Sequence, residues 1–319
     1  MLRDVIRIAR EGGSVWRVPT HSTDELDEPV GVRDGGIEGE QADLARFRDP
    51  DAAGAPEAAG YGPDSDAEPA EETPTRRSRS MSSRRTDWRL GGRTTSRWRE
   101  LVLGVAILAL GAGVLIGAGA ERLLPASVSG FVATGVLWVA MGGTVLWAFL
   151  RSRPAYLLRF SPKDLVWGLG LGLIVRTCQG WIDVATGGTG ALPSYPTIGG
   201  ALPDGWVFTD LIAPVVVAPV LEEFFFRAVV LVSLYTILRR PFGKLVAGLA
   251  AGLVSTGLFV LGHWLVGANG AGEVLSVAVL GVVCSALVLL TGRIWGAVLV
   301  HVVYNASFVV LALAGTWLG

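Results

Sequence analysis

From residue 101 onward, apolar residues gather into long stretches with few charges. Most of these stretches reach the 17–25 residues that a helix needs to cross a hydrocarbon core of about 30 Å. No alternating pattern of strands of about ten residues, which would be typical of a membrane barrel, is present. The sequence therefore predicts an all-α, polytopic membrane bundle of about seven transmembrane helices. The expected spans are 101–120, 127–150, 164–181, 207–238, 245–266, 274–291 and 294–318.

The fourth stretch, 207–238, is longer than one span requires and contains Pro214 and Pro219. Proline lacks the backbone N–H and its ring clashes with the preceding turn. We therefore expect a kink or a tilt in this helix.

The region before the first span has a different composition. Residues 24–72 hold 16 acidic side chains against three arginines, whereas residues 76–99 hold nine arginines and one aspartate. The acidic block has too few large apolar residues to offset the entropy of ordering it. We therefore expect a disordered cytoplasmic tail over 1–97 and a transmembrane domain over 98–319. The Arg-rich segment would bind anionic lipid, at about 1 kcal/mol for each arginine near the surface.

Overall composition agrees with the membrane class. The chain of 319 residues is 51% hydrophobic, and its mean hydropathy is +0.49. The net charge of −1 is a cancellation between the acidic and basic blocks and says nothing about partners. No nucleic-acid partner is expected. The two cysteines, Cys178 and Cys284, both lie in apolar runs without a CxxC motif. Neither a disulfide framework nor a thiolate zinc site is indicated.

Lysine and arginine between the spans predict an orientation. Basic residues precede the first span and occur between spans two and three, four and five, and six and seven. The segments 182–206 and 267–273 contain none. By the positive-inside rule, the N-terminus is cytoplasmic and the C-terminus lies outside the cell membrane. With straight helices this topology separates His263, near an outer end, from His301, near an inner end, so short or tilted helices would be needed to bring them together.

Two adjacent glutamates, Glu222 and Glu223, lie about fifteen residues from either end of the fourth stretch. An ionised carboxylate at that depth costs roughly 2.5–3.5 kcal/mol on insertion scales. Arg227 is four residues after Glu223, on the same helical face, and is expected to pair with it. Glu222 is rotated by about 100° and lacks this partner. We therefore expect one neutralised carboxylate and one available carboxylate.

The two histidines of the apolar region occur at a repeated spacing. His263 follows Phe259 by four residues, and Asn305 follows His301 by four, so each pair shares a helical face. Each group alone has a structural explanation, because buried ion pairs, histidines and asparagines also tie membrane helices together. The combination of all of them on three spans favours a functional site.

These residues resemble the motifs of the CPBP intramembrane metalloproteases, the CAAX prenyl endopeptidase-like family that includes bacteriocin-processing and self-immunity members. The resemblance covers about residues 207–310, the expected peptidase core, and includes the lead-in GRIWGAVLVHVVYN to the last histidine. The matching motifs, in order, are Glu222-Glu223-x-x-x-Arg227, Phe259-x-x-x-His263 and His301-x-x-x-Asn305.

The resemblance implies an intramembrane endopeptidase in which Glu222, assisted by His263, acts as general base on water. It implies that His301 and Asn305 donate to the carbonyl oxygen as negative charge develops there. The substrate would be a peptide or a lipidated protein within the membrane. The supporting residues would be Glu223, Arg227 and Phe259.

The use of a metal is left open by the residues. Glu222, His263 and His301 are a ligand set that can hold a divalent metal such as Zn²⁺ with one open position. A metal-free mechanism with a glutamate and a water molecule needs the same residues.

Two other functions use the same buried groups. One is a non-catalytic immunity or scaffold protein, in which the groups only tie helices together. The other is a proton-coupled transporter, although the chain lacks an inverted repeat of broken helices. The motifs HExxH, GxSxG and GxGD are absent from the spans, which disfavours other classes of intramembrane protease.

Overall fold

The computed structural model of the chain describes residues 86–91, 93–267 and 270–318. Its regular elements in these ranges are helices, apart from one isolated bridge between Ile198 and Ala201. Six helical units there are long and apolar enough to cross a membrane, so the predicted all-α membrane bundle is confirmed. The tail expected to be disordered lies outside the described residues as far as residue 85. The first three of the long helices are α3 (Glu100–Leu123), α4 (Ala126–Arg151) and α5 (Pro162–Ala185).

The longest unit, Val207–Leu265, contains two of the seven predicted spans. A straight helix of 59 residues would be about 88 Å long, far more than one span needs. The chain turns back at Gly243, whose φ of 76° favours glycine. Ser255 Oγ then donates a hydrogen bond of 2.8 Å to the carbonyl oxygen of Phe226, so the second half returns along the first. The six helical units therefore correspond to the seven predicted spans, because one unit contains two of them.

Four elements make up this unit, and two of them are π-helical. The two prolines lie in or next to the first π-helical stretch, where the sequence predicts a perturbed helix. There the N–H of Ala218 bonds to the carbonyl of Ala213, five residues back, instead of four. The elements are η3 (Val207–Val217), α6 (Ala218–Glu222), η4 (Glu223–Leu231) and α7 (Val232–Leu265).

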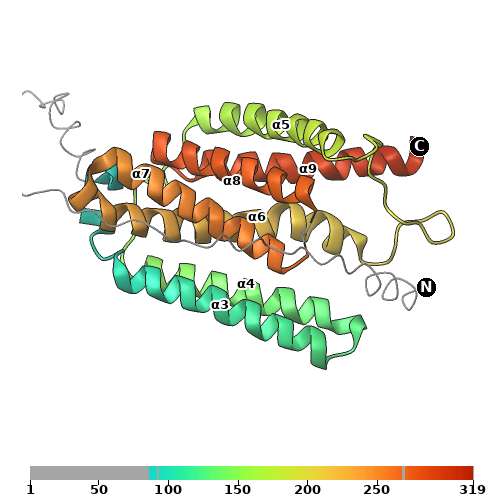
Figure 1. Ribbon diagram of the computed structural model, residues 1–319, viewed down its shortest axis with the longest axis horizontal. Coiled ribbons are helices and arrows are strands. Elements are labelled where there is room, and N and C mark those ends of the chain that lie inside the picture. Colours follow the sequence, from blue (N-terminus) through green and yellow to red (C-terminus); the bar gives the residue numbers. More distant parts are fainter. Residues whose placement is uncertain (1–85, 92, 268–269, 319) are drawn as a thin grey trace, which may run out of the picture. The chain divides into compact units, whose positions relative to one another are not determined.

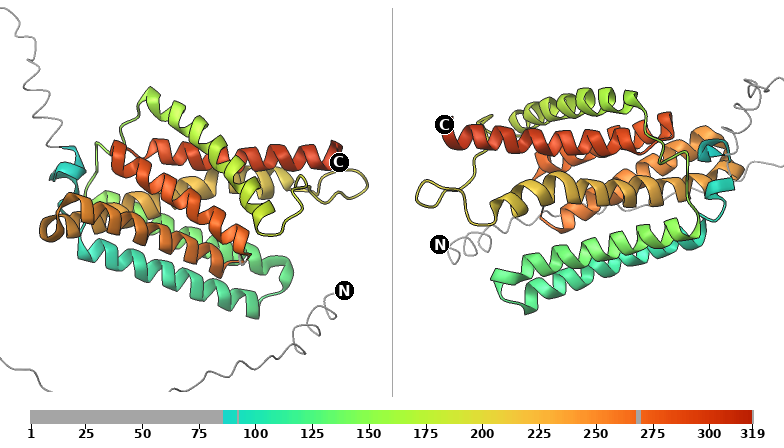
Figure 2. Two further views of the ribbon diagram at one scale, coloured as in Figure 1. Left: turned by 45° about the horizontal axis from the view of Figure 1, so that its top comes forward. Right: turned by 180° about the vertical axis from the view of Figure 1, so that it is seen from behind.

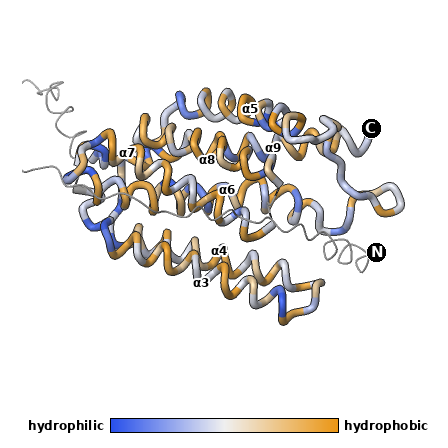
Figure 3. Tube along the Cα trace, in the orientation of Figure 1, coloured by the Kyte–Doolittle hydropathy of each residue, from blue (hydrophilic) through white to orange (hydrophobic). Residues whose placement is uncertain are grey.

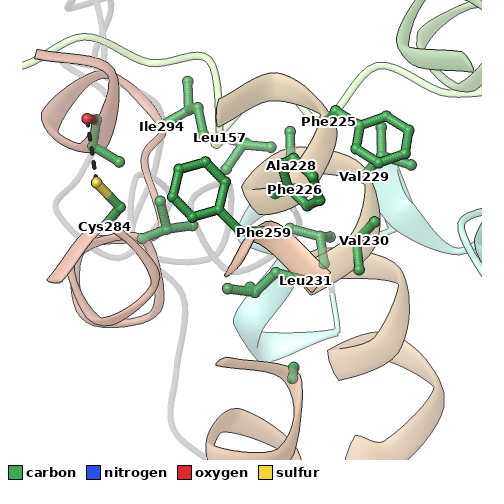
Figure 4. Close-up of a cluster of buried hydrophobic side chains, with 14 of the residues drawn as sticks. Leu157, Phe225, Phe226, Ala228, Val229, Val230, Leu231, Phe259, Cys284 and Ile294 are labelled. Atoms are coloured by element: carbon green, nitrogen blue, oxygen red, sulfur yellow. Dashed lines mark hydrogen bonds between the residues drawn. The ribbon is translucent and has the colours of Figure 1, made fainter. Parts of the chain in front are cut away.

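The bundle has η4 at its centre. Figure 1 shows the α3–α4 hairpin on one side and α5 on the other, with the remaining helices between them. These include α8 (Ala271–Thr291) and α9 (Trp295–Leu318). Residues 225–232 are all buried, as expected of a helix that is apolar on every face. Figure 4 shows the apolar side chains of Phe225, Phe226 and residues 228–231 in one cluster with Leu157, Phe259 and Ile294.

The outer faces of the bundle are apolar. Leu108 and Leu290 are 73% and 78% exposed, and Figure 3 shows apolar residues along the lengths of the helices. Polar residues gather toward the helix ends. This distribution is that of a multi-pass membrane protein whose exposed leucines contact lipid.

Residues directly before α3, which the sequence places in the tail, pack onto the bundle. Trp88 is buried, and its Nε1 donates a hydrogen bond of 3.0 Å to the carbonyl of Gly292. Trp98 is also buried and donates one of 3.0 Å to the carbonyl of Ala148. Arg89 pairs with Asp87 at 2.9 Å and donates to carbonyls at the end of α8. Arg89 therefore helps to hold this segment on the bundle, while the binding of anionic lipid by the Arg-rich segment stays a prediction.

The loops predicted to share a side of the membrane lie at the same end of the bundle (Figure 2). At one end, Arg293 pairs with the buried carboxylate of Asp164 at 2.7 Å, and Trp295 Nε1 donates to the carbonyl of Leu158 at 2.8 Å. At the other end, the N–H of Tyr195 donates to Thr316 Oγ1 at 2.8 Å. The grouping of loops follows the charge pattern, while the side that faces the cytoplasm stays a prediction.

We expect cysteine labelling to place the Arg-rich end in the cytoplasm. In a background with Cys178 and Cys284 replaced by alanine, Ile198→Cys should react in intact cells with a membrane-impermeant maleimide. Arg153→Cys should react only after permeabilisation, because the basic loops remain inside. The reverse pattern of labelling would show that the predicted orientation is inverted.

Candidate active site

The buried ion pair between Glu223 and Arg227 is the centre of the polar cluster. Both side chains are 0% exposed, and Arg227 Nη1 lies 3.1 Å from Glu223 Oε1. The predicted pairing at i,i+4 is thus confirmed. Arg227 also donates to the carbonyl of Gly281 at 3.4 Å, and its guanidinium carbon lies 4.2 Å from the ring centroid of Phe259. The pair thereby links η4 to α7 and α8.

Space for the guanidinium depends on a glycine of α8. A Cβ atom added to Gly281 would lie 2.8 Å from Thr256 Cγ2 and 3.3 Å from Arg227 Nη2. Any larger residue would therefore displace the neighbours of the ion pair. The close approach of α8 to η4 is what lets the guanidinium bond to the main chain.

His301 of α9 reaches both glutamates. The ring is 3% exposed; its Nδ1 lies 3.0 Å from Glu223 Oε1, and its Nε2 lies 3.8 Å from Glu222 Oε2. Glu223, ionised beside Arg227, can only accept a hydrogen bond from the His301 ring. The proton of that ring therefore lies on Nδ1. Nε2 of the neutral His301 ring then has a lone pair directed toward Glu222. The carboxylate of Glu222 is a hydrogen-bond acceptor as well.

Two acceptors that face one another need a proton or a water molecule between them. The distance of 3.8 Å between His301 Nε2 and Glu222 Oε2 exceeds hydrogen-bond range. A bridging water satisfies both groups at such a separation. Glu222 is 16% exposed, whereas Glu223 is fully buried. The expected division between one neutralised and one available carboxylate therefore fits the geometry.

The second predicted histidine, His263, joins the cluster through an aromatic ring. The ring of Phe259 has its centroid 4.4 Å from that of His263 and 5.7 Å from that of His301. His263 Nδ1 lies 3.0 Å from the carbonyl of Phe259, which can only accept. Nδ1 therefore carries the proton, and Nε2 of the neutral ring is free to accept one.

The position of the helical hairpin reduces the expected separation of the two histidines, because it brings both of them next to Phe259. Trp88 packs on Tyr235 at 5.1 Å and bonds to Gly292, so Tyr235 lies level with the α8–α9 turn. The chain continues from there to Gly243, about 12 Å further at 1.5 Å per residue, before it returns. This overhang brings Phe259 to the depth of His301.

Asn305 of α9 donates a hydrogen bond to the main chain of η3, the helix that precedes the one with Glu222. Its Nδ2 donates a hydrogen bond of 2.7 Å to the carbonyl of Pro214. In the π-helical register Ala218 bonds to Ala213, so residue 219 would be the donor to Pro214. That residue is proline, which has no N–H. Asn305 therefore satisfies a carbonyl that the helix cannot, and it keeps a second N–H on Nδ2.

The predicted metal ligands do not form a metal site in this arrangement. Among the residues described, no three His, Cys, Asp or Glu side chains lie close enough together to hold a metal ion. Glu222 and His301 face one another, but His263 lies beyond the ring of Phe259. We derive no chemical step through a metal, and a divalent metal stays a prediction from the resemblance alone.

One polar group was missed in the sequence. Arg176 lies inside the third predicted span. A single charge among so many apolar residues does not change the prediction of a transmembrane helix. Its Nη2 donates to the carbonyl of Tyr304 at 2.5 Å, and Tyr304 Oη donates to Gln179 Oε1 at 2.8 Å. The signal was available, because an arginine within an apolar stretch is itself uncommon.

We predict that the cost of losing Asn305 depends on Pro219. Asn305→Ala leaves the Pro214 carbonyl without a donor, which destabilises the fold by about 1–3 kcal/mol. In a Pro219→Ala background the main chain regains an N–H directed at that carbonyl, so Asn305→Ala should cost much less. Thermal unfolding of the four proteins in detergent measures this; equal losses in both backgrounds would contradict the assigned hydrogen bond.

The comparisons with known proteins find one family for the part of the chain that carries these residues. Residues 204–307 match the model of the family described as type II CAAX prenyl endopeptidase Rce1-like, a range that includes Glu222, His263, His301 and Asn305. No curated protein and no solved structure matches the chain. A match to this family supports a CAAX-type intramembrane protease in general terms. The resemblance expected from the three motifs is thereby confirmed: residues 204–307 of this chain match the model of the Rce1-like, type II CAAX prenyl endopeptidases.

Proposed function

We propose that this protein is an intramembrane endopeptidase in which Glu222 activates water for attack on a peptide bond of a lipidated, membrane-associated substrate. The observation that carries the proposal is the position of Glu222 Oε2, 3.8 Å from His301 Nε2, in a cluster whose other carboxylate is neutralised. A general base must be within reach of a water molecule, directly or through one partner. We infer that this water lies beside the two atoms, within hydrogen-bond distance of both.

The reaction follows from these groups. Glu222 takes a proton from the water, whose oxygen forms a bond to the carbonyl carbon of the substrate and leaves an oxyanion. The oxyanion accepts hydrogen bonds from donors held in place beforehand, for which the second N–H of Asn305 is the candidate. His301 would join it as a donor only with a proton on Nε2 as well as on Nδ1. The C–N bond then breaks, and Glu222 returns its proton to the leaving amine. The assistance of His263 that the resemblance implies would have to reach Glu222 past the ring of Phe259, for example through a second water molecule.

The ion pair has a different role from Glu222. Glu223 holds His301 by its Nδ1, and Arg227 keeps Glu223 ionised so that this hydrogen bond forms. A rigid supporting shell of this kind fixes the geometry of the reacting groups. A non-catalytic membrane protein would need the ion pair in the same way, but it would have no use for Glu222.

We predict that Glu222→Gln and Arg227→Ala separate catalysis from stability. Glu222→Gln removes the base but retains the shape of the side chain, so abundance and unfolding temperature should stay unchanged while cleavage falls by at least 100-fold. Arg227→Ala leaves Glu223 buried without a partner, which costs about 3–5 kcal/mol. Its abundance in the membrane and its unfolding temperature should therefore fall.

The assay uses full-length protein in nanodiscs and a farnesylated peptide that ends in cysteine, two aliphatic residues and methionine. Glu100→Gln, at the exposed start of α3, is the matched control and should change neither activity nor stability. Cleavage by Glu222→Gln at the wild-type rate would contradict the assignment of the base. Similar stability losses in Glu222→Gln and Arg227→Ala would contradict the division of roles.

A further inference from the structure

Arg176, a cation of α5, has no acidic partner in the part of the chain that the structure describes. Three donor positions of Arg176 are engaged by neutral acceptors: Nε bonds to Ser307 Oγ at 3.2 Å, Nη1 to Gln179 Oε1, and Nη2 to the carbonyl of Tyr304. No carboxylate of the residues described lies within ion-pair distance of it. Since a guanidinium has five N–H groups, two remain available. An unpaired charge at membrane depth is more often functional than structural.

This arginine lines a cavity. A hollow of about 760 Å³ lies between α5, α9 and the loop at 190–193, and Arg176, Trp181, Leu192 and Phe308 are among its lining residues. The guanidinium carbon is stacked 4.0 Å from the ring centroid of Tyr304. Stacking of this kind leaves the edge of the guanidinium for a planar anion, such as a carboxylate. The rest of the lining is mostly apolar, as in sites that bury aliphatic side chains, and its other polar members are Thr177, Gln179 and Asp183.

The cavity lies along α9 from the candidate active site. Tyr304 and Ser307, which hold Arg176, follow His301 by three and six residues, which is about 4.5 and 9 Å along the helix axis. A peptide cut next to the prenylated cysteine of a C-a-a-X end has three residues between the reacting carbonyl and its terminal carboxylate. In an extended peptide these three residues span about 10 Å. The distance along α9 from His301 to Ser307 therefore matches the length of the three-residue peptide end.

We propose that this cavity binds the C-terminal carboxylate of the peptide substrate and that Arg176 recognises it. The proposal rests on the proposed function for the identity of the ligand. It assigns to α5, outside the matched region 204–307, a part in choosing the substrate. Because the carboxylate lies only three residues from the scissile bond, such a site would measure the length of the peptide end.

The test is binding by full-length protein with Glu222→Gln in phosphatidylcholine nanodiscs, which removes turnover. Two fluorescent farnesylated C-a-a-X peptides are compared that differ only in a free carboxylate or an amide at the C-terminus. The free acid should bind about 10- to 100-fold more tightly, as expected for charge-assisted hydrogen bonds. Arg176→Gln should lower the affinity for the free-acid peptide to that for the amide peptide, and it should leave the affinity for the amide peptide unchanged. Arg159→Gln, at an exposed arginine, should keep the full difference.

The comparison of acid with amide needs no variant of Arg176, so it stands even where Arg176→Gln fails to fold. Equal binding of the two peptides would overturn the proposal. If phosphatidylglycerol in the nanodisc then weakened both peptides, the cavity would be assigned to a lipid phosphate. Failure of the proposed function is seen separately: the free acid would bind more tightly, but protein with Glu222 intact would not cleave it.

Discussion

The buried pair of Glu223 and Arg227 is the interaction on which the rest of the site depends. Neither side chain reaches solvent, and each would be costly in hydrocarbon without the other. Arg227 adds a bond to α8 and a ring contact to α7, and Glu223 adds a bond to His301 of α9. One ion pair thus joins the helices that carry the three motifs. It also fixes which nitrogen of His301 is protonated, and so directs the other nitrogen toward Glu222.

The fold supports this pair by surrounding η4 with protein. Residues 225–232 are buried on every face, and so are both side chains of the pair, which therefore contact helices and not lipid. The π-helical turn before it leaves the carbonyl of Pro214 free, and Asn305 bonds to that carbonyl. The irregular backbone near Glu222 is therefore tolerated at membrane depth because it is satisfied within the protein. The helix that carries Glu222 is fixed from both ends, by Asn305 on one side and by the ion pair on the other.

Much of this could be predicted from local sequence, and the rest could not for physical reasons. The spans, the pairing at i,i+4 and the grouping of basic loops follow from periodicity and charge, which are local properties. The contact of His301 with both glutamates joins residues nearly 80 positions apart, so no local pattern contains it. The same is true of Trp88, whose indole bonds to Gly292 although its neighbours resemble a tail. The partner of Asn305 depends on a π-helical register that proline content alone does not define.

The central claim is that Glu222 acts on water while Glu223 and Arg227 only hold the site together. The most direct measurement replaces the pair by neutral residues of similar shape, Glu223→Gln with Arg227→Gln, because no buried charge is then left alone. Cleavage of a farnesylated C-a-a-X peptide by this double variant is compared with cleavage by Glu222→Gln. The account predicts measurable cleavage by the double variant and none by Glu222→Gln. Cleavage by Glu222→Gln together with a folded but inactive double variant would contradict it.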